Sequence, residues 1–180
     1  MPNFIIIGGV KSGTTALYHY LAEHSQVYMS PIKEPNFFLF ERTHPMQHLA
    51  MRDHYEAKFF ELALVNSATS WEAYQALFNG VMKEKAVGEA SAGYLHAKQV
   101  PERIFRYTPN VKLIAILRAP VERAFSHFLF FIRLGVEPTY DFSKAIRTQN
   151  CRTERYIEVG QYYRALKRYF SLFDKSRIKI

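Results

Sequence analysis

The stretch "NFIIIGGVKSGTTALYHYL", residues 3–21, decides the fold that the sequence predicts. Phe4 to Ile7 form a short apolar run that ends in Gly-Gly, a pattern typical of a buried strand entering a tight loop. From Thr14 onward the apolar residues have helical spacing. A glycine loop between a strand and a helix exposes backbone N–H groups at the positive end of the helix dipole, so this segment predicts an anion-binding site.

The loop nearly matches the Walker A motif of nucleotide triphosphate sites, G-x-x-x-x-G-K-[ST]. Gly8 and Gly13 have the required spacing, but Thr14 stands where the motif has lysine, and the nearby lysine is Lys11, inside the loop. A plain turn with a Ser/Thr helix cap is the alternative interpretation. The run Lys-Ser-Gly-Thr-Thr is richer in donors than a cap requires and favours anion binding. The candidate residues are Lys11, Ser12, Gly13, Thr14 and Thr15.

The rest of the chain alternates strand-like and helical patterns. Strands are predicted at 86–89, at 111–117 and from 177 to the last residue, and helices at 99–107 and 162–173. A helix at 121–132 is predicted to bury one stripe, made of Val121, Ala124, Phe125, Phe128, Leu129 and Ile132. The helix at 162–173 is predicted to bury Tyr163, Leu166, Phe170 and Phe173. Residues 31–78 are harder to interpret, and we read them as two helices with loops. The alternation predicts an α/β fold of three layers, with a central parallel sheet flanked by helices.

Ligands of such sheets bind beyond the carboxyl ends of the strands. Those ends carry the glycine loop, then Glu89 with Ser91, then Arg118. A P-loop NTPase would place a magnesium-binding Asp at a neighbouring strand end, whereas arginine is a good phosphate ligand. The rim therefore predicts phosphate binding by protein cations without a metal, which weakens the kinase and NTPase interpretation.

The segment "LRAPVERAFSHF", residues 117–128, continues from that strand end. Arg118 and Ser126 together are predicted to hold a second phosphate group. Arg123 shares the non-apolar side of the helix with Ser126 and, taken alone, is interpreted as part of a solvated face. Glu89 could take a proton from an attacking hydroxyl or amine, especially if partial burial raises its pKa, although a lone Glu at a strand end is more often structural.

Composition narrows the class of protein. The 180 residues are 48% apolar and carry a formal net charge of +8, which argues against disorder and favours an anionic partner. The basic residues are scattered, so a phosphorylated small ligand or an anionic polysaccharide fits as well as nucleic acid does. No run approaches the roughly 20 apolar residues of a membrane span, and no secretory leader is recognisable. These features predict a soluble, cytoplasmic protein, although a leader or anchor could precede it.

Three blocks, "GGVKSGTTAL", "VGEASAGYL" and "LRAPVERAFSHF", together resemble the sulfotransferases that use 3′-phosphoadenosine 5′-phosphosulfate (PAPS). The similarity is greatest to the branch with the heparan sulfate sulfotransferases and their bacterial relatives. "PIKEPNFF" at 31–38 and "GQYYRALKRYF" at 160–170 match the same branch in the same order. The resemblance covers nearly the whole chain and implies a P-loop-like fold, a nucleotide donor and, as product, 3′-phosphoadenosine 5′-phosphate (PAP).

The resemblance also implies roles for particular residues. The loop from Lys11 to Thr15 would bind the 5′-phosphosulfate, with Lys11 offsetting charge on the leaving phosphate oxygen. Arg118 and Ser126 would bind the ribose 3′-phosphate. Glu89 would be the general base, supported by Ser91 and Tyr94, and Lys33 would face the junction of donor and acceptor. The reaction would be an in-line sulfuryl transfer without a metal. The acceptor would be a carbohydrate, with a lipid or an acyl chain as alternatives, and no nucleic acid partner is expected.

Members of this family continue past the strand that begins at "RIKI", with a later basic loop over the cofactor. Residues 1–180 are therefore expected to be a single sulfotransferase domain, truncated at its C-terminus. Two other functions stay open, a P-loop kinase or NTPase and a non-enzymatic module that binds polyanions. His44, His48 and His54 are close in sequence, but they lack the further ligands of a zinc site and favour a solvated helix or an acceptor-side surface. Cys151 is interpreted as an incidental thiol.

Overall fold

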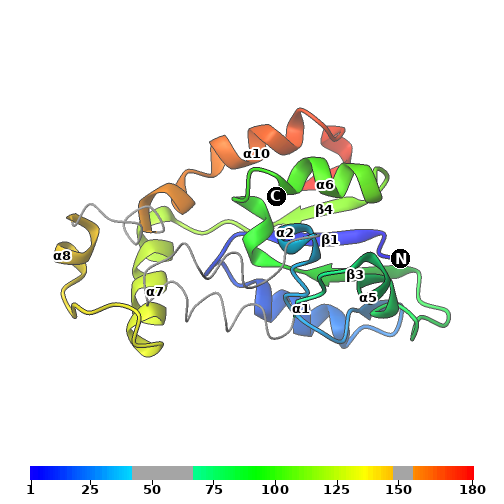
Figure 1. The fold of residues 1–180 in the computed structure, drawn as a ribbon, viewed down its shortest axis with the longest axis horizontal. Helices are drawn as coiled ribbons and strands as arrows, with labels where there is room; N and C mark the ends of the chain where they lie inside the picture. Colours follow the sequence, from blue (N-terminus) through cyan, green and yellow to red (C-terminus); the bar gives the residue numbers. More distant parts are fainter. Residues whose placement is uncertain (42–66, 148–155) are drawn as a thin grey trace.

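The computed structural model describes residues 1–41, 67–147 and 156–180. Five strands form one sheet in the order β2-β3-β1-β4-β5, and every neighbouring pair is parallel. The strands are β1 (Phe4–Gly8), β2 (Val27–Met29), β3 (Ala86–Ala90), β4 (Lys112–Ala115) and β5 (Ile178–Lys179). The sheet confirms the predicted fold class, because helices connect its parallel strands and cover both of its faces (Figure 1).

Strand β1 lies in the middle of the sheet and every residue of it is buried. Its alternating side chains enter two apolar clusters. Phe4 and Ile6 pack on one face with Leu17 and Leu21 of helix α1 (Thr14–Ala22). Ile5 and Ile7 pack on the other face, in the larger cluster. The side chains of β1 thus alternate between the two faces of the sheet and contact the helices on each face.

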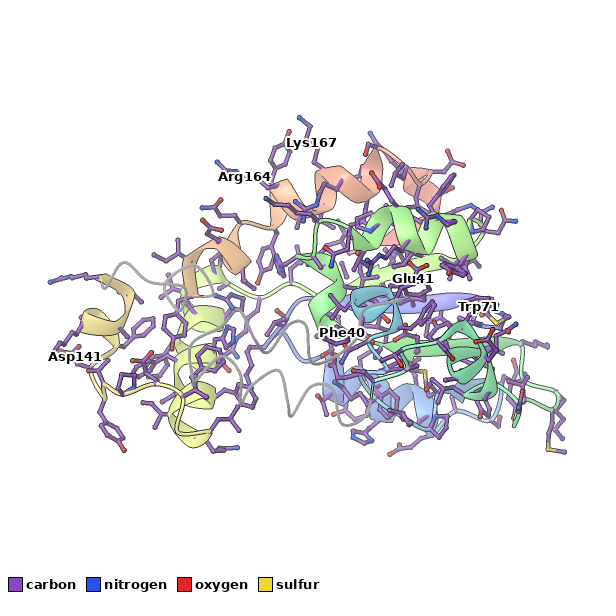
Figure 2. The ribbon with its side chains drawn as sticks, in the orientation of Figure 1. Phe40, Glu41, Trp71, Asp141, Arg164 and Lys167 are labelled. Atoms are coloured by element: carbon purple, nitrogen blue, oxygen red, sulfur yellow. The ribbon has the colours of Figure 1, made fainter. Side chains whose placement is uncertain are left out.

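The larger cluster includes side chains from four helices and one 3-10 helix. These elements are α2 (Phe37–Phe40), α5 (Trp71–Ala76), η1 (Ala92–Leu95), α6 (Val100–Tyr107) and α10 (Tyr162–Phe170). Phe37, Phe38 and Tyr74 are almost fully buried here. On the outer side of α10, Arg164 and Lys167 point away from the sheet (Figure 2).

Helix α7 (Pro120–Arg133) follows β4 and packs with α8 (Phe142–Arg147) at one end of the molecule (Figure 1). The predicted stripe on α7 is wrong for three of its members: Val121 is 75% exposed, Phe125 46% and Leu129 48%. The helix instead buries Ala124, Phe128 and Phe131 against residues of α8 and Tyr156. Because α7 contacts this small cluster rather than the sheet, the helical period alone did not identify its buried side.

The prediction that Arg123 lies on a solvated face is also wrong, because its side chain has no exposed surface. Its guanidinium donates to the carbonyl of Tyr156 and lies 3.2 Å from Nδ1 of His127. A buried guanidinium needs such acceptors to offset its lost hydration. Arg123 therefore ties α7 to residue 156 and is part of the fold.

Other boundaries differ by small amounts. Helix α10 ends at Phe170, and its predicted face is half correct, since Leu166 is buried and Tyr163 is 76% exposed. Strand β2 was not predicted, and the short elements α8, η2 (Glu158–Gly160) and η3 (Lys175–Arg177) were not either. Helices α2 and α5 lie within 31–78, but residues 42–66 are outside the described ranges, so the interpretation of this section as two helices with loops stays a prediction. His44, His48, His54 and Cys151 lie outside the described residues.

Candidate active site

The loop between β1 and α1 is fixed by backbone bonds to the end of β4. The amide of Gly9 donates to the carbonyl of Ile116 at 2.7 Å, and the amide of Ile116 donates to Gly8 at 2.6 Å. Lys11 and Gly13 have φ angles of 62° and 97°, in the left-handed region. Gly13 precedes α1, and no described side chain caps this helix. The first-turn N–H groups are therefore open to an anion.

Cations gather around this loop. The ammonium of Lys11 lies 4.3 Å from the centre of the Phe130 ring on α7. Partial burial lowers the pKa of Lys11, and the charges of Arg133, Arg118 and Lys33 lower it further. Among the residues that the structure describes, no carboxylate forms an ion pair with Lys11. Like charges this close repel one another, so an anion placed between them would be stabilised.

The hydroxyl groups of the loop differ in exposure. Thr14 is buried and Thr15 is exposed. The Oγ of Ser12 is buried, and within the described ranges it has no hydrogen-bond partner. A buried hydroxyl without a partner is unfavourable, and a phosphate oxygen would satisfy it.

Arg118 lies just beyond β4 and is partly exposed, as the prediction of a phosphate ligand requires. In this structure its Nε donates to Oε2 of Glu122, 3.1 Å away and one turn along α7. Such exposed pairs contribute less than about 1 kcal/mol, so a phosphate can replace the carboxylate at low cost. Ser126 is half-buried on α7, eight residues beyond Arg118. Its participation in the same site stays a prediction.

Glu89 lies near the end of β3 with no exposed surface. Ser91 Oγ donates to its Oε2 at 2.8 Å, and the hydroxyl of Tyr74 donates to its Oε1 at 3.2 Å. Burial raises the pKa of Glu89 to about 8, although hydrogen bonds from Ser91, Tyr94 and Tyr74 act in the opposite direction. The sequence placed Glu89 at this strand end and allowed for a pKa raised by partial burial, whereas the carboxyl is completely buried here. Its role as general base stays a prediction.

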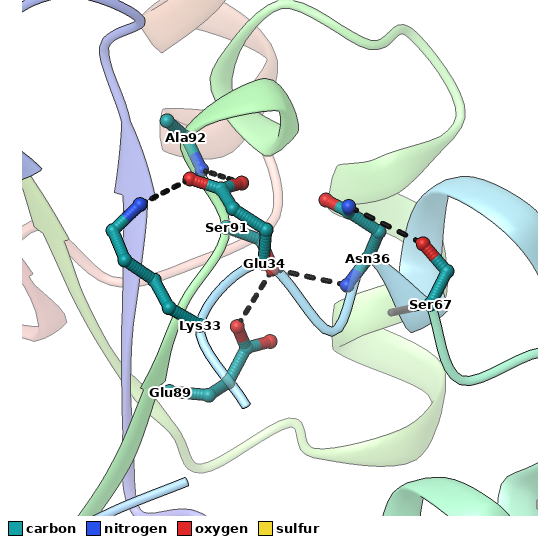
Figure 3. A network of polar contacts seen from close by, with 7 residues as sticks. All are labelled: Lys33, Glu34, Asn36, Ser67, Glu89, Ser91 and Ala92. Carbon is teal, nitrogen blue, oxygen red and sulfur yellow. Dashed lines mark hydrogen bonds and ion pairs between the residues drawn. The ribbon is translucent and has the colours of Figure 1, made fainter. Parts of the chain in front are cut away.

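A second carboxylate, Glu34, is closer to solvent, and it was not among the candidate residues predicted from the sequence. Its side chain is 35% exposed, and Oε1 accepts from Lys33 Nζ at 2.5 Å. Its Oε2 accepts from the amide of Ala92 at 2.9 Å. Figure 3 shows this pair beside Ser91 and Glu89. The adjacent charges of Lys33 and Glu34 in "KEPNFF" were the available signal, because Lys33 lies within electrostatic range of Lys11 in the loop.

A family model described as "Sulfotransferase family" matches residues 2–179. The chain belongs to the sulfotransferase family. This observation confirms the resemblance inferred from the three sequence blocks, and it agrees with a sheet whose carboxyl ends carry the loop and its cations.

Relatives within the sulfotransferase family support this assignment. The membrane-associated sulfotransferase kil1 of Dictyostelium discoideum is 35% identical over 133 residues, covering 74% of this chain and 24% of the relative. Human carbohydrate sulfotransferase 15 is 27% identical, covering all of this chain and 40% of the relative. The chain thus spans less than half the length of these two relatives. A crystal structure of a sulfotransferase from Alicyclobacillus acidocaldarius matches 99% of this chain and 72% of its own, with a TM-score of 0.80 and 32% identity.

The structure brings most of the predicted sulfotransferase site together. Lys33 and Arg118 are close enough for their charges to lower the pKa of Lys11, and Glu34 is close enough for its charge to raise the pKa of Glu89. In the described ranges no group of three His, Cys, Asp or Glu residues could hold a metal. None of the helices described there is long and apolar enough to cross a membrane. The predictions of a metal-free reaction and of a cytoplasmic location stay predictions.

Proposed function

We propose that this chain transfers a sulfuryl group from PAPS to a hydroxyl or amine of an acceptor. The observation that carries the proposal is the cluster of cations around an uncapped helix N-terminus at the carboxyl end of a parallel sheet. PAPS carries phosphate groups at both ends of its ribose, and the cluster has cations both inside the loop and beyond β4. Membership of the sulfotransferase family supports the same donor.

The loop would bind the 5′-phosphosulfate. The N–H groups of the first turn of α1 and the hydroxyls of Ser12, Thr14 and Thr15 would donate to its oxygens. Gly13 leaves space for this, since a side chain added there would meet no atom within 4 Å. Arg118 and Ser126 would bind the 3′-phosphate, with Arg118 exchanging Glu122 for the ligand.

The transfer is an in-line displacement. The acceptor oxygen or nitrogen attacks sulfur, the bond from sulfur to the 5′-phosphate oxygen breaks, and PAP leaves with the negative charge. Lys11 would face that developing charge, which is where electrostatic stabilisation accelerates the reaction. Lys33 would face the sulfuryl oxygens from the acceptor side.

The acceptor loses a proton in this step, and two carboxylates are candidates to receive it. A general base must come within hydrogen-bond distance of the proton. Glu34 is partly exposed beside Lys33, whereas Glu89 is fully enclosed. This difference favours Glu34 as the base and leaves the predicted direct role of Glu89 as the competing assignment.

Relatives named carbohydrate sulfotransferase 15 and heparan sulfate N-deacetylase/N-sulfotransferase make a carbohydrate the favoured acceptor, with a lipid or acyl chain as the alternative. The test is transfer of labelled sulfate from PAPS across a panel of chondroitin, N-desulfated heparan, a hydroxylated lipid and an acyl thioester. We expect transfer to at least one carbohydrate, with turnover reduced by roughly 10²- to 10⁴-fold in Glu34→Gln. Absence of transfer to every acceptor, or full activity of Glu34→Gln, would contradict the proposal.

A further inference from the structure

Glu89 is a buried carboxyl group that the transfer does not use if Glu34 is the base, as proposed above. Three hydroxyl groups surround it, from Ser91, Tyr74 and Tyr94. Tyr74 and Tyr94 are themselves fully buried. Placing a carboxyl group away from water costs free energy even when it is hydrogen-bonded, so its presence here calls for a function beyond packing.

Each of the three hydroxyl-bearing residues contacts one of three successive residues at the start of α2. Ser91 Oγ accepts from the amide of Asn36 at 3.2 Å. The ring of Tyr74 stacks on Phe37, with 4.8 Å between ring centres and 21° between planes.

Tyr94 completes the set, since its hydroxyl accepts from the amide of Phe38 at 3.3 Å. The residues that surround Glu89 therefore hold 36, 37 and 38 in turn. This segment closely follows the pair Lys33–Glu34.

Two hydrogen bonds connect Glu34 to the end of β3, which carries Glu89, and to the start of η1. The amide of Glu34 donates to Ala90 at 2.9 Å, and the amide of Ala92 donates to the Glu34 carboxylate at 2.9 Å. Glu34 and Asn36 both have left-handed φ angles, 62° and 52°. Non-glycine residues adopt this conformation mainly where surrounding contacts impose it. The turn that presents Glu34 thus depends on its attachment to the residues around Glu89 (Figure 3).

We propose that Glu89 is a positioning residue that orients the hydroxyls of Ser91, Tyr74 and Tyr94 and thereby fixes the turn carrying Lys33 and Glu34. Two carboxyl oxygens can order several hydroxyl groups in one direction, which an apolar side chain cannot do. A displacement of about 1 Å at a reacting group can cost roughly 10²-fold in rate, so an anchored turn matters for transfer.

Amide hydrogen exchange tests the anchoring without any ligand. In Glu89→Gln we expect the amides of Asn36 and Phe38 to exchange at least roughly tenfold faster, while those of β1 are unchanged. Ser91→Ala keeps the Glu89 carboxyl and removes the Oγ that bonds to Glu89, Asn36 and Tyr94, so it serves as a second variant if Glu89→Gln does not fold. The matched control is Glu137→Gln, a buried carboxyl bonded to the Tyr156 hydroxyl at 2.7 Å in the α7 cluster.

The control should leave exchange in 34–38 within about twofold of the wild type. Unchanged exchange in this segment in folded Glu89→Gln would overturn the proposal. If that variant does not fold, unchanged exchange in Ser91→Ala would overturn it equally.

A double-mutant cycle tests the consequence for turnover, which rests on the proposed function. With PAPS and the acceptor found in the panel, Glu89→Gln should lower kcat by about 10- to 100-fold and leave the KM for PAPS within about twofold. In a Glu34→Gln background the same change should have little further effect, because Glu89 acts through Glu34.

An equal loss in both backgrounds would overturn the positioning role and support Glu89 as an independent base. Failure of all sulfate transfer would count against the proposed function alone, because the exchange result does not depend on it.

Discussion

The raised pKa of Glu89 makes the free energy of unfolding depend on pH, and the substitution Glu89→Gln should remove this dependence. Burial raises this pKa from 4.5 to about 8. Between these values the unfolded chain has lost the proton and the folded chain keeps it, so stability falls as the pH rises. One unit corresponds to about 1.4 kcal/mol, so a gap of roughly 3.5 units lowers the free energy of unfolding by about 5 kcal/mol between pH 4.5 and 8.

Urea unfolding of the wild type and Glu89→Gln from about pH 4.5 to 9 measures this contribution. The wild-type value minus the Glu89→Gln value should fall by about 5 kcal/mol up to about pH 8 and then become constant. Tyr74→Phe keeps the carboxyl but removes a hydrogen bond that lowers its pKa, so the decline should extend to higher pH. A difference between wild type and Glu89→Gln that does not change with pH would refute the reasoning.

Three further predictions concern other parts of the fold. Gly88→Ala would place a methyl group 2.2 Å from the Phe4 ring and should destabilise the protein by roughly 1–3 kcal/mol; an unchanged Tm would contradict this. Ser70 caps α5 by accepting from the amide of Ala73 at 3.1 Å, so Ser70→Ala should cost about 1 kcal/mol in urea unfolding, and no cost would argue against the cap. Burial, with nearby arginines, lowers the pKa of His96 to about 4, and an NMR titration midpoint near its ordinary value of 6.5 would disprove it.

Features that depend on neighbours in the sequence were predictable. The apolar run of β1, its two glycines and the helical spacing after Thr14 follow one another directly, so the central strand, the loop and the helix after it were identified. The parallel sheet then followed from the alternation of elements. Because ligands bind at the carboxyl ends of parallel strands, the order of the strands along the chain was enough to group Glu89 and Arg118 with the loop.

Features that depend on distant segments were not predictable. Arg123 is buried because it bonds to the carbonyl of Tyr156, 33 residues away, and no local pattern signals that partner. Two hydrogen-bond partners of the buried Glu89, Tyr74 and Tyr94, lie on separate elements. Strand β2 has only three residues, too few for a period to be recognised. Glu34 was not selected because its exposure and its bond to the amide of Ala92 depend on a turn that the sequence does not reveal.

Titration of PAP in EDTA by calorimetry tests the central claim, that this site binds the adenosine donor through protein cations. We expect PAP to bind the wild type with micromolar or better affinity. Lys11→Ala and Arg118→Ala should each weaken binding by at least roughly tenfold, while Lys167→Ala on the outer side of α10 should not. Tight, magnesium-dependent binding of ATP instead of PAP would contradict the account. Unchanged PAP binding by both Lys11→Ala and Arg118→Ala would also contradict it.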